Sequence, residues 1–151
     1  IKLFIPLVGC YRGLAQFLGG DVKAASDSFA IAADAAKELG HVSANLRARL
    51  YLILSMGSLA HAWPRALEEL RDVAAAVKQQ GFGPLHLETL VAEAALMRLA
   101  GQPDAAQRSE REAQSVAAEL DAQGALRLAQ RIGAVLQQGA ASSRDALSGM
   151  A

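Results

Sequence analysis

The chain has 151 residues, of which 15 are basic and 15 acidic, so its formal net charge is zero. This length allows one domain with a hydrophobic core, and the balanced charge argues against a nucleic-acid-binding surface, which normally shows a basic excess. Hydrophobic residues make up 52% of the chain but aromatic residues only 5%, which favours closely packed helices over sheets. The single cysteine, Cys10, excludes an internal disulfide and a cysteine-rich metal site, and we expect a cytoplasmic protein.

The first twenty residues, "IKLFIPLVGCYRGLAQFLGG", are largely apolar. Pro6 and Arg12 interrupt them, and the stretch lacks the run of about 18 uncharged apolar residues that a membrane span needs. We therefore predict a helix over residues 2–18 that uses its apolar face to pack on another helix, and no membrane insertion.

The next stretch, "LGGDVKAASDSFAIAADAAKELGH", holds seven alanines and a single phenylalanine. Asp21 is a suitable N-cap, and Gly40 follows the basic residue Lys37, an arrangement typical of a helix end. These signals predict a helix over 21–39. Alanine-rich faces let helix backbones approach closely, so we expect this helix to lie between two neighbours, with Phe29 filling the space between hairpins.

Later breaks fall at Trp63-Pro64, Gly81-Phe82-Gly83, Gln102-Pro103 and Gly124. Proline is tolerated in the first turn of a helix, where its missing N–H has no partner to lose. The breaks predict five more helices, over 42–60, 64–80, 84–100, 103–121 and 124–138. The small, polar residues 139–151 are typical of a flexible tail or linker.

An internal repeat connects these helices. The stretches "LGGDVKAA", "LAHAWPRA" and "LAGQPDAA" each begin with a leucine, at Leu18, Leu59 and Leu99, and each has an alanine seven residues later. The offsets are 41 and 40 residues, a period typical of stacked helical repeats. We predict units of two helices at about 1–40, 41–81 and 82–122, a capping helix over 124–138, and a repeat domain over 1–138.

The first unit resembles the second half of a tetratricopeptide repeat. It carries Gly20-Asp21 at the hairpin turn, then Ala25, Phe29 and Ala32, with Gly13 at the small first-helix position. The second unit has Ala66, Leu70 and Val73, and the third has Ala106 and Ala113 but Glu110 at the aromatic position. We expect the stripe formed by the matching residues of the first two units to be buried: Ala25, Phe29, Ala32, Ala66, Leu70 and Val73. The longer period is similar to repeats of bacterial multidomain regulators, such as large signal-transduction ATPases and maltotriose-responsive transcription activators.

This resemblance implies an all-α, right-handed α-α superhelix of about three helical hairpins plus a C-terminal helix. It also implies a concave groove lined by the first helix of each hairpin. Carried over by register, the tentative partner-binding residues of the groove are Leu14, Phe17, Tyr51, Ser55, Ser58, Glu88, Val91 and Arg98. The terminal helices of a repeat stack need a polar outer face, and the first helix is apolar on several sides. We therefore expect either a neighbouring helix on its N-terminal side or self-association through residues 1–18.

The sequence assembles no convincing catalytic, metal or cofactor site. None of His41, His61 and His86 has a second histidine or cysteine three or four residues further on. His86 with Glu88 and Glu93 would suit acid-base work, but a solvated helix start explains the same residues. We expect a chain that is not an enzyme and needs no cofactor.

Two functions stay open at this point. The first is a non-catalytic protein-protein interaction scaffold, a regulatory fragment of a larger signalling or transcription-regulating protein. Its partner would be a protein, a peptide or a neighbouring domain of the same chain, without direct contact to nucleic acid. The alternative is the small-molecule-sensing domain of a bacterial regulator that binds an effector in the concave groove.

Overall fold

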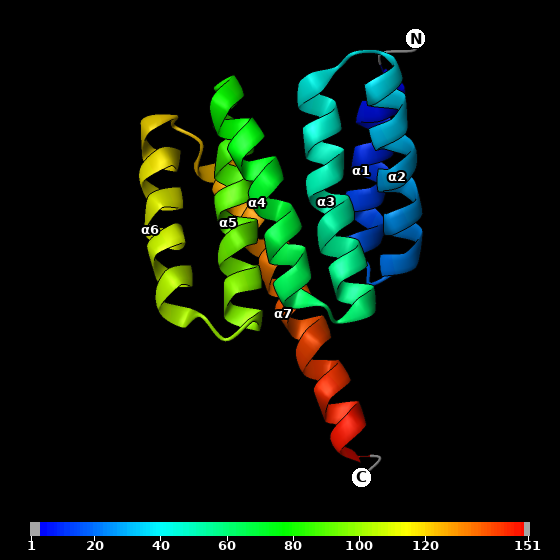
Figure 1. The fold of residues 1–151 in the computed structure, drawn as a ribbon, viewed down its shortest axis with the longest axis vertical. Helices are drawn as coiled ribbons and strands as arrows, with labels where there is room; N and C mark the ends of the chain where they lie inside the picture. Colours follow the sequence, from blue (N-terminus) through cyan, green and yellow to red (C-terminus); the bar gives the residue numbers. More distant parts are fainter. Residues whose placement is uncertain (1–3, 150–151) are drawn as a thin grey trace.

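The computed structural model describes the backbone of residues 4–149 and the side chains of residues 4–142. Within this range the chain forms seven α-helices and no strand (Figure 1), which confirms the all-α prediction. The helices are α1 (Phe4–Leu18), α2 (Val22–Glu38), α3 (Val42–Ala60), α4 (Trp63–Gln80), α5 (Gly83–Leu99), α6 (Pro103–Glu119) and α7 (Gln123–Gly149). Residues 2–3 of the expected first helix and 150–151 of the expected tail lie outside the described residues, as does residue 1.

The helix breaks lie where the sequence predicts them, because local chemistry decides them. The Asp21 side chain accepts a hydrogen bond of 3.1 Å from the backbone N–H of Ala24, which confirms it as the N-cap of α2. Gly40 and Gly81 adopt φ values of +66° and +72° at the ends of α2 and α4, where residues with a Cβ would be strained. Pro103 begins α6 as expected.

The last helix is longer than its sequence suggests. We expected it to end at residue 138 and a flexible tail to follow, but α7 continues through residues 139–149 to Gly149. Ala140 is 3% exposed and packs in the main hydrophobic cluster. This tertiary contact extends the helix beyond Gly139, which in isolation would weaken it.

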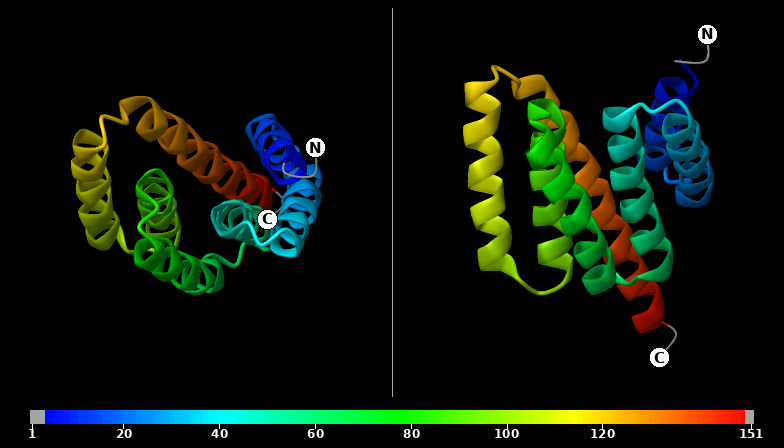
Figure 2. Two further views of the ribbon diagram at one scale, coloured as in Figure 1. Left: turned by 90° about the horizontal axis from the view of Figure 1, so that it is seen from above. Right: turned by 45° about the horizontal axis from the view of Figure 1, so that its top comes forward.

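Successive helices pack as antiparallel hairpins (Figure 1). In addition, α1 contacts α3, and α3 contacts α5. The first helix of each hairpin therefore lines one side of the array. Figure 2 shows that α7 leaves α6 and crosses this side. It packs mainly on α5 and also contacts α3 and α1. The last helix thus covers part of the face that the hairpins present.

Small residues allow close helix packing within the hairpins. All six side chains expected to be buried are at most 3% exposed, which confirms the predicted stripe: Ala25, Phe29, Ala32, Ala66, Leu70 and Val73. A Cβ atom placed on Gly13 of α1 would lie 2.5 Å from Cε1 of Phe29 in α2. One placed on Gly57 of α3 would lie 2.8 Å from Cβ of Ala66 in α4. Both hairpins therefore depend on a glycine in their first helix.

Replacing Gly13 with alanine should destabilise the fold, because the new methyl group overlaps the ring of a fully buried phenylalanine. We expect a loss of about 1–3 kcal/mol in the free energy of unfolding, measured by chemical denaturation. The control is Gly139→Ala in α7, where an added Cβ meets nothing within 4 Å. This change should stabilise the protein by about 0.5–1 kcal/mol because alanine has the higher helix propensity. Equal effects of the two substitutions would contradict the packing of α1 on α2.

Candidate functional site

A pocket of about 170 Å³ lies between α1 and α7, with α3 and α5 beneath it. We call it the α1/α7 pocket. Its walls are mainly apolar, and its charged residues come from α3 and α5. It is lined by Leu7, Cys10, Tyr11, Leu14, Arg47, Pro84, Glu88, Ala125, Leu128 and Ala129. Leu7, Tyr11 and Leu128 are at least 40% exposed, so apolar side chains surround the opening and also reach solvent.

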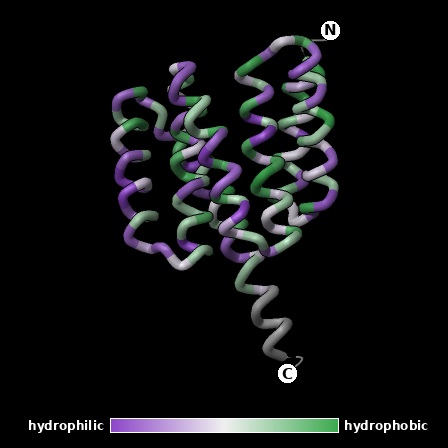
Figure 3. Tube along the Cα trace, viewed as in Figure 1, coloured by the Kyte–Doolittle hydropathy of each residue, from purple (hydrophilic) through white to green (hydrophobic). Residues whose placement is uncertain are grey.

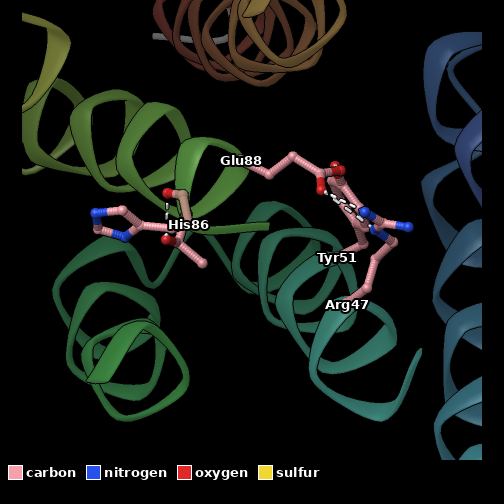
Figure 4. Close-up of polar contacts among 5 residues, drawn as sticks. Arg47, Tyr51, His86 and Glu88 are labelled. Atoms are coloured by element: carbon pink, nitrogen blue, oxygen red, sulfur yellow. Dashed lines mark hydrogen bonds and ion pairs between the residues drawn. The ribbon is translucent and has the colours of Figure 1, made fainter. Parts of the chain in front are cut away.

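Glu88 of α5 holds the charged part of the pocket together (Figure 4). Its Oε2 accepts hydrogen bonds from Nε and Nη2 of Arg47, at 3.2 Å and 2.9 Å. Its Oε1 accepts a hydrogen bond of 2.5 Å from the hydroxyl of Tyr51. The Tyr51 ring stacks on Phe29, with ring centroids 5.5 Å apart. The cluster therefore joins α3 and α5, and through Tyr51 it also reaches α2.

Burial and mutual charge shift the pKa values in this cluster. Burial lowers the pKa of Arg47, but the charge and hydrogen bonds of Glu88 outweigh that effect, so the net pKa is raised. Burial, followed by the negative charge of Glu88, raises the pKa of Tyr51 well above its usual range. At neutral pH the arginine is therefore cationic and the phenol is a neutral donor.

Cys10 lies at the wall of the pocket, but its thiol has low reactivity. Burial, as the largest effect, raises the pKa of its thiol to about 11. The thiol, rather than the reactive thiolate, is the form present at neutral pH. Cys10 packs with Ala32, Ala33 and Ala48 in a small cluster of α1, α2 and α3. Its position thus favours a packing role.

Most of the groove residues proposed from the resemblance are covered. Leu14, Phe17, Tyr51, Ser55 and Val91 are buried, Ser58 and Glu88 are half-buried, and Arg98 is exposed. Residues of α7 line a space of about 220 Å³ together with Val91, and a space of about 10 Å³ together with Tyr51 and Glu88. The structure brings Leu14 and Glu88 together in the α1/α7 pocket and Tyr51 beside them, whereas Arg98 lies apart and pairs with Glu110 of α6 at 2.8 Å.

Sequence reasoning missed Arg47, although a signal for it was present. Arg47 and Glu88 have opposite charges and are 41 positions apart, which is one repeat period. Residues at equivalent positions of neighbouring first helices lie in the same register, so such a pair can meet across α3 and α5. Tyr51 is one turn after Arg47 on the same side of its helix, which explains why all three side chains converge.

Two of the residues considered for acid-base chemistry, His86 and Glu88, do not face one another. Figure 4 shows the His86 side chain pointing away from Glu88, on another side of α5. The Nε2 atom of His86 lies 3.9 Å from Oε1 of Glu112, and its buried Nδ1 has no hydrogen-bond partner among the described residues. Burial raises the pKa of Glu93, which the charge of Arg71 partly opposes. This arrangement offers no shared position for a substrate between His86 and Glu88.

Comparison of this chain with family models, curated proteins and solved structures gives no match. Within the described part of the chain, no group of three or more His, Cys, Asp and Glu side chains is placed to hold a metal ion. No described helix is both long and apolar enough to span a membrane. The site is therefore interpreted from its own geometry.

Replacing Glu88 with alanine should remove the carboxylate that accepts hydrogen bonds from Arg47 and Tyr51. The Tyr51 hydroxyl would then be buried without a hydrogen bond. We expect the free energy of unfolding to fall by about 1–3 kcal/mol, measured by urea denaturation. The matched control is Glu110→Ala, which also breaks an arginine pair between neighbouring helices but at the surface. That substitution should cost less than about 1 kcal/mol. Similar losses in both variants would show that Glu88 does not organise the pocket.

Cys10 should resist alkylation in the folded protein, because burial keeps its thiol protonated and out of contact with the reagent. We expect labelling by iodoacetamide at pH 8 to be much slower in the native protein than in urea-unfolded protein, as followed by mass spectrometry. The raised pKa also means that the folded state binds the thiol proton more tightly than the unfolded state. The contribution of Cys10 to stability should therefore be present below pH 9 and decrease as the pH rises towards 11. A Cys10→Ala variant should lack this component of the pH dependence.

Proposed function

We propose that this chain is a non-catalytic protein-protein interaction module, a regulatory fragment of a larger signalling or transcription-regulating protein. We further propose that its hairpins form a right-handed superhelix of the tetratricopeptide type. The helix order, the contacts between alternate helices and the buried stripe of small residues support the superhelix. The function itself rests on one observation, the exposed apolar rim of the α1/α7 pocket above a paired arginine.

The chemistry of the pocket suits recognition of an apolar segment. Leu7, Tyr11 and Leu128 offer apolar surface that a partner can remove from water. Beneath them, Nη1 of Arg47 donates no hydrogen bond to any described residue, and the arginine side chain is 34% exposed. A backbone carbonyl of a bound segment can accept a hydrogen bond from this nitrogen. An apolar side chain of the same segment can then enter the pocket. The carboxylate of Glu88 already accepts three hydrogen bonds from Arg47 and Tyr51, which favours binding over catalysis.

The small-molecule sensor is the second candidate, and the size of the pocket supports it. A volume of about 170 Å³ is similar to that of engineered cavities of about 150 Å³ that bind benzene. An effector of that size would contact α1, α3, α5 and α7 at once. Binding would then be transmitted by a shift of α7 relative to α1.

Selection of peptides from a displayed library against the intact chain separates these proposals. We expect apolar peptides whose affinity falls by about tenfold or more in a Leu128→Glu variant, because a charge replaces apolar surface at the rim. The matched control is Ile31→Glu, since Ile31 is 65% exposed on α2 and does not line the pocket. Peptide binding should be unchanged in this control.

The opposite results would change the function that we assign to the pocket. Peptides that bind the Leu128→Glu variant as well as the original chain would contradict the interaction site. A metabolite that raises the melting temperature in proportion to its concentration, and loses this effect in the Leu128→Glu variant, would instead support the sensor. Failure of both screens would argue against a binding role for the pocket.

A further inference from the structure

One side of α1 presents a continuous row of large apolar residues to solvent. Phe4, Leu7, Val8 and Tyr11 are 64%, 41%, 60% and 62% exposed. Their spacing of three or four residues places them on one side of the helix. We call these four residues the outer row of α1. Single exposed apolar residues are common on proteins, but a contiguous row indicates an interaction surface.

The internal repeat identifies what covers the equivalent row elsewhere in this chain. The helices α2 and α4 begin 41 positions apart, at Val22 and Trp63. The same offset places the outer row of α1 in register with four residues of α3: Asn45, Ala48, Arg49 and Leu52.

Two residues of the equivalent row of α3, Asn45 and Ala48, contact α2, whereas Arg49 in that row is exposed. Ala48 is 0% exposed and packs in one cluster with Ala32 and Ala33 of α2. Asn45 donates a hydrogen bond of 2.9 Å from its side chain to the backbone oxygen of Ala33. Leu52 is partly buried against the main core. The two positions that contact the preceding helix in α3 correspond to Phe4 and Leu7, and both of these are exposed in α1.

We propose that the outer row of α1 binds an amphipathic helix of a partner protein, packed on α1 as α2 packs on α3. The partner helix should carry a stripe of alanine or glycine, because the row already supplies the large side chains. Leu7 stands where α3 has Ala48, and Phe4 where α3 has Asn45. Close packing of such a row requires small residues opposite it.

A second copy of this chain fits the row less well. The opposite end of the array is α6, which Figure 3 shows largely in hydrophilic colours. The buried residues of α6 are Ala106, Ala113 and Ala117, so its remaining faces are mostly polar. Pairing of α1 with α1 of another copy also lacks a small-residue stripe. Gly9 and Gly13 already face α2, where added Cβ atoms would lie 3.0 Å from Ala32 and 2.5 Å from Phe29.

A synthetic peptide with the sequence of residues 21–40 tests this inference, because it carries the pattern that covers the equivalent row of α3. A second peptide, of residues 62–81, supplies the sequence of α4. Binding to the full chain is followed by fluorescence anisotropy. We expect at least one peptide to bind, and Val8→Glu and Phe4→Glu to weaken that binding by about tenfold or more. Ile31→Glu is the control for an added charge on an exposed helix face, and should leave binding unchanged.

Each other outcome overturns the inference. If neither peptide binds, or if binding is insensitive to Val8→Glu and Phe4→Glu, the outer row is not a site for a helix of this kind. If light scattering shows a dimer that Val8→Glu dissociates, the occupant is a second copy of this chain. The test is separate from that of the α1/α7 pocket, because Phe4 and Val8 do not line the pocket and Leu128 is not part of the row. Loss of peptide binding in Leu128→Glu alone would assign the effect to the pocket instead.

Discussion

Close approach of helix backbones is the constraint on which the rest of this structure depends. Gly13 leaves room for the ring of Phe29, and Gly57 leaves room for the methyl group of Ala66. With so few aromatic side chains, the chain can bury apolar surface effectively only if its helices pack at short distance. Alanine and glycine make this possible because they add little bulk at the crossing points. The pairing of Arg47 with Glu88 between α3 and α5 follows from that packing.

The charged cluster shows how the packing creates a site. Arg47 and Glu88 lie one repeat period apart, so the close packing of hairpins brings them face to face. Tyr51, from the same helix as Arg47, donates a further hydrogen bond to Glu88. A partly buried pair of this kind contributes little net stability when it is compared with apolar packing, but it is costly to break. It also places a cation at a fixed position at the base of an apolar pocket.

The last helix changes which surfaces of the array are exposed. In a plain stack of hairpins α7 would continue the series on α6, but it packs mainly on α5 and crosses towards α1. Its residues Ala129, Ile132 and Leu136 fill the face that the first helices would otherwise present. The α1/α7 pocket at one end and the outer row of α1 beside it are both left exposed. Both exposed surfaces are therefore at the N-terminal end of the array, and both involve α1.

The sequence by itself determined the all-helical class, six of the helix breaks and the buried stripe, because these depend on local signals. A capping aspartate, glycines with positive φ and alanines at helical spacing act within a few residues of chain. The repeat register also contained the Arg47–Glu88 pair, although it was not recognised. Only the tertiary structure decided the extension of α7 beyond residue 138, its path across α5, and the burial of Tyr51, Ser55 and Val91. These depend on contacts between residues far apart in the chain, such as Ala140 with the main core, and no local pattern encodes which face of a stack a terminal helix will cover.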